Sequence, residues 1–191
     1  MIYSNVDKVI IYTPFKNFSS SLHAYYSGKP RYHSIVGPSP DYNFSLTTKV
    51  NRHTGFMPDD IDKEYTKYLP IRNPYDRVMS QYNWHLKTCG EISFNEWFMV
   101  HSKQPVCHPV TTIYPKFDKV LHVENLVNEL RENNLLLKKP STQEEFPFPH
   151  KNPTENKRII NFTDEQKEAI YYFHYDDFLA GGYSKEYVRP S

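Results

Sequence analysis

The feature of this sequence that most constrains its fold is a repeated order, in which a short apolar run precedes a segment that begins like a helix. The apolar runs are rich in β-branched and aromatic residues, as buried strands are. Three pairs of a predicted strand and a predicted helix have this order: Val6–Tyr12 with Leu22–Tyr26, Tyr68–Ile71 with Pro74–Leu86, and Lys119–Val123 with Glu124–Asn133. Strands that alternate with helices predict an α/β fold, in which helices flank a central, largely parallel sheet.

Capping signals mark where several helices begin. Asn73 suits the N-cap position, Pro74 the first helical position, and Asp76 the third residue of a capping box. Capping boxes also begin two further predicted helices, Ser93–Val100 and Thr163–His174. The first predicted helix has a serine available as its N-cap.

The rest of the chain predicts shorter or irregular elements. These are a strand over Phe44–Val50, a short acidic helix over Pro58–Tyr65, loops over Gly28–Asp41 and Pro140–Pro153, and a turn over Asp176–Gly182. Pro70 weakens the prediction of its strand, because proline cannot donate to a sheet ladder. No repeat and no linker divides the chain, so we expect a single domain over residues 1–191.

Composition excludes several classes of protein. Aromatic residues make up 16%, which argues against disorder, and the formal net charge of +1 does not fit a general nucleic-acid binder. No apolar stretch approaches the roughly 18 residues of a membrane span. Because Met1–Lys8 is polar, we expect no signal peptide, no membrane partner and a cytoplasmic location. Cys89 and Cys107 are expected to be free thiols, although they can pair if the fold brings them together.

Glycine is scarce where phosphate-binding loops need it. The chain has six glycines, and none lies between Met1 and Ser27. The Walker loop G-x-x-x-x-G-K-[ST] and the dinucleotide turn G-x-G-x-x-G are therefore both absent. Any phosphate chemistry must use another kind of loop.

The first candidate site is the segment from Tyr12 to Leu22, which joins the first predicted strand to the first predicted helix. A helix N-terminus holds an anion through its free N–H groups and its dipole. Three consecutive serines, Ser19, Ser20 and Ser21, can add hydroxyl donors there, and Lys16 can add a full positive charge. The alternative is that the serines only cap the helix and that Lys16 is solvated.

The second candidate site is the junction of strand and helix at Arg72–Ser80. Arg72 stands just before the predicted helix, where its guanidinium can bind an anion in fork geometry. Arg77 and Ser80 are three residues apart and share one helical face. The alternative is an ordinary capped helix whose arginines pair with acids such as Asp76.

Taken together, the two segments resemble the sulfotransferases that use 3′-phosphoadenosine 5′-phosphosulfate, and the carbohydrate (heparan-type) branch is the most similar. Phe15–Leu22 resembles the donor loop P-K-x-G-x-[ST]-S-L, and Arg72–Tyr82 matches R-[DN]-P-[YVF]-x-R-x-x-S-x-[YF] throughout. Phe117–Leu126, His150–Asn152 and Phe162–Tyr183 are similar to later segments of the family. The resemblance covers Lys8 to Tyr183 and implies a P-loop-like three-layer fold. Phe15 stands where the family has proline, and Phe18 where it commonly has glycine or alanine.

The resemblance implies a role for each matching residue. Lys16 is expected to contact the 5′-phosphosulfate and to stabilise charge on the bridging oxygen as the sulfuryl group leaves. The other expected donor contacts are Asn17, Ser19, Ser20 and Ser21 around the 5′-phosphate, Arg72 and Ser80 at the 3′-phosphate, and Lys151 near that phosphate. Arg77 matches the motif and can be structural.

The acceptor hydroxyl also needs a general base. We select His53, because it follows a predicted strand and the family often has a histidine between its two donor motifs. Lys49 is a rival for that role, and so is Glu124, which is more readily explained as a residue that braces the site. Trp84 and Trp97 are predicted to be core residues rather than a ligand platform.

The sequence thus predicts a sulfotransferase that moves a sulfuryl group from 3′-phosphoadenosine 5′-phosphosulfate to an acceptor hydroxyl, possibly on a carbohydrate. The product nucleotide is 3′-phosphoadenosine 5′-phosphate, and no metal is expected, because His101, Cys107 and His108 lack a recognised zinc spacing. One alternative is a non-catalytic protein that binds this nucleotide through an altered loop. Another is a nucleotide kinase, which the missing Walker glycines disfavour.

Overall fold

The structure is a computed structural model that describes residues 1–4, 6–26, 33–34, 64–101, 104, 107–149 and 159–186. The predicted strand at 44–50, the predicted loop at 28–41 apart from 33–34, and nearly all of the predicted helix at 58–65 lie outside these residues. Two predicted site residues, His53 and Lys151, also lie outside them, as does the rival base Lys49.

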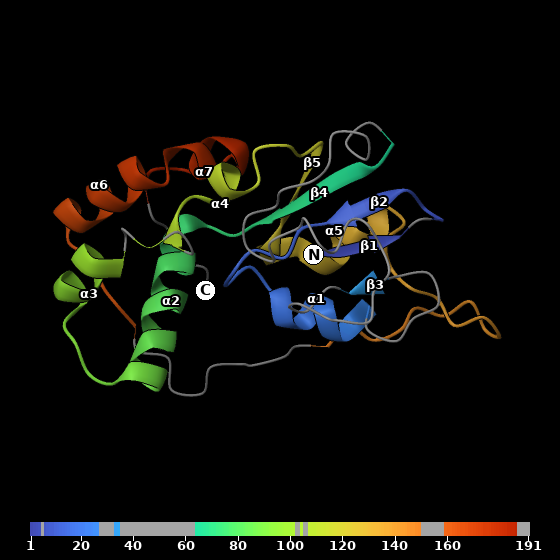
Figure 1. Ribbon diagram of the computed structural model, residues 1–191, viewed down its shortest axis with the longest axis horizontal. Helices are drawn as coiled ribbons and strands as arrows, with labels where there is room; N and C mark the ends of the chain where they lie inside the picture. The colour runs from blue at the N-terminus through green and yellow to red at the C-terminus, as the bar shows by residue number, and fades with distance from the viewer. Residues whose placement is uncertain are drawn as a thin grey trace.

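The centre of the fold is a five-stranded sheet in the order β3-β1-β2-β4-β5 (Figure 1). Its strands are β1 (Ile2–Ser4), β2 (Val9–Ile11), β3 (His33–Ser34), β4 (Thr66–Ile71) and β5 (Lys119–His122). The strands β2, β4 and β5 are parallel, whereas β1 pairs antiparallel with both β2 and β3. The predicted parallel α/β sheet is therefore confirmed, and it carries an antiparallel edge that the sequence did not reveal.

Helices connect and cover these strands. Their bounds are α1 (Ser19–Tyr26), α2 (Pro74–Cys89), α3 (Phe94–His101), α4 (Val110–Ile113), α5 (Leu126–Glu132), α6 (Asp164–Phe173) and α7 (Tyr175–Ala180), and a 3-10 turn, η2 (Val123–Asn125), leads into α5. The prediction of a turn at Asp176–Gly182 is wrong, because α7 occupies most of it. Asp177 explains the helix there: its carboxylate accepts hydrogen bonds from the backbone N–H groups of Val110 and Thr111, both at 2.9 Å, and so ties α7 to α4.

The predicted caps at Asn73 and Thr163 are confirmed at the level of individual bonds, but the predicted capping box with Asp76 is wrong, because the backbone N of Asn73 donates to Glu124 at 2.8 Å. The side chain of Asn73 accepts a hydrogen bond from the backbone N of Tyr75 at 3.0 Å, and Pro74 is the first residue of α2. The side chains of Thr163 and Gln166 form a reciprocal capping box at the start of α6. These local polar contacts fix where the helices begin, independently of what the helices pack against.

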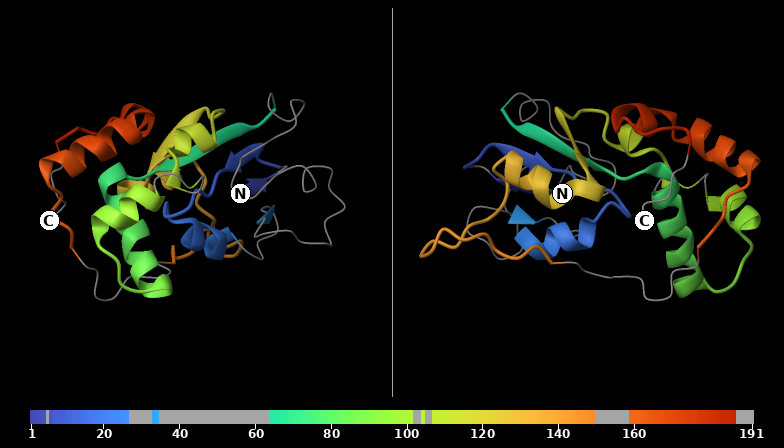
Figure 2. Two further views of the ribbon diagram at one scale, coloured as in Figure 1. Left: turned by 60° about the vertical axis from the view of Figure 1, so that its left-hand side comes forward. Right: turned by 180° about the vertical axis from the view of Figure 1, so that it is seen from behind.

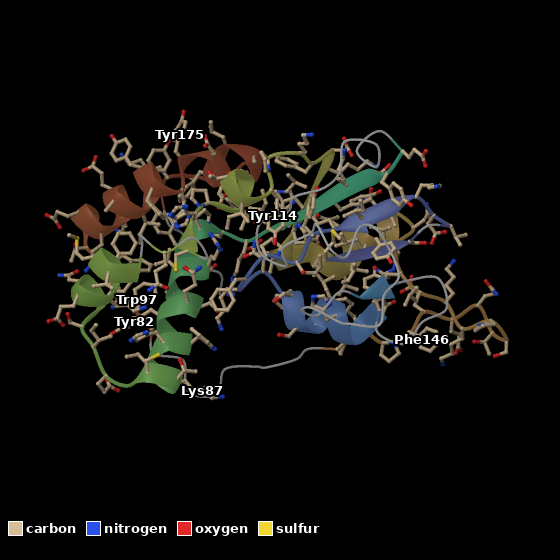
Figure 3. All side chains as sticks on the ribbon, viewed as in Figure 1. Tyr82, Lys87, Trp97, Tyr114, Phe146 and Tyr175 are labelled. Carbon is tan, nitrogen blue, oxygen red and sulfur yellow. The ribbon has the colours of Figure 1, made fainter. Side chains whose placement is uncertain are left out.

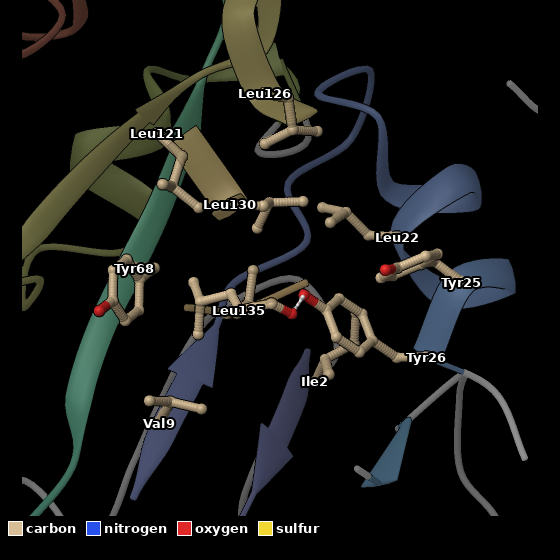
Figure 4. Close-up of a cluster of buried hydrophobic side chains, with 11 residues drawn as sticks. Ile2, Val9, Leu22, Tyr25, Tyr26, Tyr68, Leu121, Leu126, Leu130 and Leu135 are labelled. Atoms are coloured by element: carbon tan, nitrogen blue, oxygen red, sulfur yellow. Dashed lines mark hydrogen bonds between the residues drawn. The ribbon is translucent and has the colours of Figure 1, made fainter. Parts of the chain in front are cut away.

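Two apolar layers enclose the sheet. On one face, α1 and α5 pack with β2 and β5 through a cluster that includes Leu22, Tyr26, Leu121 and Leu130 (Figure 4). Within it, the hydroxyl of Tyr26 donates to the backbone oxygen of Leu135 at 2.9 Å, which satisfies a buried polar group. On the opposite face a second cluster packs strand residues against α4 and the end of α7.

The remaining helices form a group of their own beside the sheet, visible on the left of Figure 1 and from behind in Figure 2. There α2, α3, α6 and α7 share an aromatic cluster around Tyr75, Tyr82 and Trp97. Trp97 is buried, as predicted, but the prediction of a core position for Trp84 is wrong, since 44% of it is exposed. Cys89 and Cys107 are free thiols, and no described helix is long and apolar enough to cross a membrane.

Candidate functional site

The two predicted sites meet at one edge of the sheet. The strands β2 and β4 are parallel neighbours, so the loop after β2 and the junction after β4 leave the sheet on the same side. A hydrogen bond from Asn17 Nδ2 to the backbone oxygen of Pro70, 2.8 Å long, ties this loop to the end of β4. Ligands of parallel α/β sheets bind at this edge, beyond the carboxyl ends of the strands.

The loop between β2 and α1 has an unusual backbone. Lys16 and Phe18 both have positive φ angles, 65° and 60°, in the left-handed region that glycine adopts without strain. The resembled donor loop commonly has glycine or alanine at the position of Phe18, whereas here a phenylalanine adopts the backbone conformation that glycine favours. The ring of Phe18 packs against the apolar cluster under α1, and that contact offsets part of the strain.

The helix α1 begins earlier than predicted, and this changes the role of the serines. Its first residue is Ser19, and its first intrahelical hydrogen bond runs from Leu22 N to Phe18 O at 3.0 Å. The predicted serine N-cap is therefore wrong, because all three serines lie inside the first turn. Backbone N–H groups in a first turn have no intrahelical acceptor, so a first turn can bind an acceptor from outside the helix.

The four loop residues predicted to bind the donor are not equally placed. Ser20 is exposed and Ser19 is half-buried, which leaves both beside the N-terminus of α1. Ser21 and Asn17 are buried, and the amide of Asn17 is directed to Pro70 inside the protein. Asn17 therefore acts in this structure as a brace that shapes the loop, and its Oδ1 has no hydrogen-bond partner among the residues that the structure describes.

Lys16 is in an environment that disfavours its charge. It is half-buried, and burial is the largest cause that lowers its pKa to about 8, followed by the positive charges of Arg72 and Lys87. A lysine whose pKa is lowered by both burial and neighbouring cations is a frequent property of functional sites. Because the charge of Arg72 acts on Lys16, the side chains of these two residues lie in the same region of the protein.

Arg72 stands between β4 and α2 and is half-buried. Within the described part of the chain, no carboxylate lies within ion-pair distance of either Arg72 or Lys16. The alternative that Arg72 pairs with a nearby acid such as Asp76 is thus not what the structure shows. Two cations that repel each other without a compensating acid are stabilised when an anion binds between them.

Arg77, by contrast, is a structural residue. It is fully buried, and its guanidinium donates to the backbone oxygens of Phe15 at 3.4 Å and His108 at 2.9 Å. It also lies 3.7 Å from the buried carboxylate of Asp177. Arg77 therefore joins the loop after β2 to the α4 and α7 region, and it has no surface left for a ligand.

Glu124 braces the same edge of the sheet. Its carboxylate accepts hydrogen bonds from the backbone N of Asn73 at 2.8 Å and from the hydroxyl of Tyr183 at 2.7 Å. Burial and the neighbouring carboxylate of Glu124 raise the pKa of Tyr183 well above its usual value, so this hydroxyl remains a donor. The network holds Asn73, and with it the start of α2, against the end of β5, which supports the bracing interpretation of Glu124.

A hollow of about 240 Å³ borders the loop on the side of α5. Phe18 and Phe148 form aromatic walls, and residues 123–128 at the start of η2 and α5 complete it. It is smaller than the pockets of about 300–1,000 Å³ that enclose whole small-molecule ligands. It can therefore receive one ring or side group of a ligand that lies along the loop.

On α2, the predicted site residue Ser80 is half-buried and shares its side of the helix with two exposed residues, Trp84 and Lys87, that the sequence analysis did not assign to the site. Ser80, Trp84 and Lys87 are spaced by four and three residues and so lie along one side of this helix. Figure 3 shows Lys87 near the far end of α2, and its charge acts on Lys16. The sequence already indicates this shared side through the spacing of the three residues. It was not used to predict a site, because Trp84 was expected to be a core residue.

Comparisons with known proteins give no further guide to this site. No protein-family model matches the chain, and no curated protein and no solved structure was found to be similar to it. The site is therefore interpreted from its own geometry and from the resemblance of its two motifs.

Proposed function

We propose that this protein is a sulfotransferase that transfers a sulfuryl group from 3′-phosphoadenosine 5′-phosphosulfate to an acceptor hydroxyl, possibly on a carbohydrate. The observation that carries the proposal is that Lys16 and Arg72 lie in one region at the same edge of the sheet, after the parallel strands β2 and β4 and beside the N-terminus of α1. Two separated cations at such an edge fit a nucleotide that has a phosphate at each end of its ribose. The proposal includes a P-loop-like arrangement of β2, the following loop and α1.

In the proposed reaction, the acceptor oxygen forms a bond to sulfur while the bond from sulfur to the bridging oxygen of the donor breaks. The ammonium of Lys16 stabilises the negative charge that develops on the bridging oxygen, and Ser19, Ser20 and the first turn of α1 hold the 5′-phosphate. Arg72, with Ser80, holds the 3′-phosphate. Catalysis then depends on positioning and on stabilisation of charge, as it does in phosphoryl transfer.

A general base has to remove the proton of the acceptor hydroxyl, and His53 is proposed for this step on sequence grounds alone. Glu124 fits the step poorly, because both of its oxygens already accept hydrogen bonds from Asn73 and Tyr183. Lys16 with a pKa of about 8 is protonated at neutral pH, which suits a group that stabilises charge rather than one that removes a proton.

The first experiment compares the thermal stabilisation by 3′-phosphoadenosine 5′-phosphate with that by AMP, ADP and ATP. The bisphosphate should raise the unfolding midpoint most, because only it engages both Lys16 and Arg72. The second experiment measures transfer of labelled sulfate to a panel of glycans and small alcohols. Lys16→Ala should lower transfer about 10²–10³-fold, as the loss of a charge-stabilising donor does, and Arg72→Ala should weaken donor binding.

The matched control is Lys139→Ala, which removes a partly exposed lysine that pairs with Glu144 away from the site. It should leave both donor binding and transfer unchanged. Transfer that persists in both Lys16→Ala and Arg72→Ala contradicts the proposed site. Better binding of ATP with magnesium than of the bisphosphate favours a kinase.

The second candidate function is a non-catalytic protein that binds the bisphosphate nucleotide. The observation that favours it is the bulk of Phe15 and Phe18 in the donor loop, where the resembled family has smaller residues. Calorimetry separates the two candidates: tight binding of 3′-phosphoadenosine 5′-phosphate, without sulfate transfer to any acceptor tested, supports the binding protein.

A further inference from the structure

We propose that Trp84, together with Phe15, is a positioning residue that holds the ammonium group of Lys16 at the mouth of the loop between β2 and α1. The role of Lys16 in sulfuryl transfer rests on the proposed function, whereas the contact itself does not. Nothing in the two donor motifs assigns a role to Trp84, since it lies two residues beyond the end of the second motif.

The contact consists of two aromatic rings and one cation. The rings of Phe15 and Trp84 meet edge to face, with centroids 5.2 Å apart and planes at 84°. The Nζ atom of Lys16 lies 5.2 Å from the centroid of the Phe15 ring and 5.5 Å from that of Trp84. Both distances are within the roughly 6 Å over which a ring face attracts a cation.

Lys16 needs such a contact because its charged neighbours repel it. The charges that act on its ammonium are those of Arg72 and Lys87, both positive, and no described carboxylate is within ion-pair distance. A lysine side chain has four rotatable bonds, so repulsion alone would turn its ammonium away from the other cations and into solvent. Among the described residues, the two rings are the contacts that keep it in place.

The helix α2 presents Trp84 to the loop in a fixed position. Arg77, seven residues earlier and on the same side of the helix, donates to the backbone oxygen of Phe15 and so fastens the loop to α2. Trp84 then lies two turns further along the helix, against the ring of Phe15, while 44% of it stays exposed. A large apolar side chain that contributes little to the core and contacts a cation is better explained by that contact than by packing.

The test compares Trp84→Phe with Trp84→Leu, because both keep an apolar side chain but only the first keeps a ring. In ligand-free protein, the rate at which Lys16 reacts with acetic anhydride is measured from pH 6 to 10 by peptide mass spectrometry. The Trp84→Phe midpoint should stay near that of the natural protein. In Trp84→Leu the midpoint should fall by about 0.3–0.7 pH units, a two- to fivefold decrease in the ratio of protonated to neutral Lys16, because the cation–π attraction is lost.

The control is Tyr172→Leu, which removes an exposed ring on α6 and should leave the midpoint of Lys16 unchanged. Equal midpoints in Trp84→Phe and Trp84→Leu would overturn the proposal. Binding of 3′-phosphoadenosine 5′-phosphate is measured in parallel, and Trp84→Leu should weaken it about two- to fivefold relative to Trp84→Phe. If the nucleotide binds none of these proteins, the proposed function fails, while the labelling result still decides the role of Trp84.

Discussion

The strained backbone at Phe18 leads to a prediction about protein stability. Glycine usually destabilises a protein relative to alanine, but at this position the glycine variant should be the more stable. Phe18 has a φ of 60°, a conformation that costs a residue with a side chain about 1–2 kcal/mol and costs glycine nothing. Phe18→Ala and Phe18→Gly both remove the half-buried ring, so they lose the same packing against the cluster under α1. They differ in that the alanine variant keeps the strain and the glycine variant does not.

The size of the difference follows from two opposing contributions. Relief of the left-handed strain favours glycine by about 1–2 kcal/mol, and the greater freedom of glycine in the unfolded chain opposes it by about 0.4–1 kcal/mol. Phe18→Gly should therefore be more stable than Phe18→Ala by about 0.5–1 kcal/mol in urea denaturation, with equal m-values. Ala24→Gly, at an exposed position in α1, is the control and should lose about 1 kcal/mol. If Phe18→Ala is the more stable variant, the left-handed conformation of this loop is refuted.

Three further predictions concern single contacts. Asn73→Ala should cost about 1 kcal/mol of unfolding free energy, measured with urea, because the N-cap of α2 is lost; an unchanged midpoint would exclude the cap. Arg77→Met should cost about 3–5 kcal/mol, because it leaves the Asp177 carboxylate buried without its cation, and adding Asp177→Asn should recover part of the loss. Strictly additive losses would show that the two groups are not coupled. Because the pKa of Lys16 is about 8, calorimetric affinity for 3′-phosphoadenosine 5′-phosphate should fall as pH rises from 7 to 9.5, and a flat profile would remove Lys16 from the site.

The part of the fold that the sequence predicts is the part fixed by local chemistry. The caps at Asn73 and Thr163 were predictable because each depends on side chains within three residues of the helix start. The strand β1 was not, because it is three residues long and is defined by its pairing with β2 and β3. The helix α7 was missed for the same reason: Asp177 stabilises it through contacts with residues 110 and 111, far away in the sequence.

The candidate site is likewise predictable from the sequence only in part. That Lys16 and Arg72 lie at one edge of the sheet follows from two parallel strands, and the sequence is sufficient to predict those. The inward direction of Asn17 and the exposure of Trp84 depend on how the loop after β2 sits against β4 and α2. Such contacts join residues more than fifty positions apart, so no local pattern indicates them.

The buried guanidinium of Arg77 has a consequence for how motion at the loop spreads through the protein. A single side chain holds the carbonyl of Phe15, the carbonyl of His108 and the carboxylate of Asp177, and these belong to three separate stretches of the chain. Local opening of any one stretch breaks a contact that the other two share, so the three should exchange their amide hydrogens as one cooperative unit. An anion that orders the loop after β2 would then slow exchange in α4 and α7 as well, on the far side of the sheet from α1.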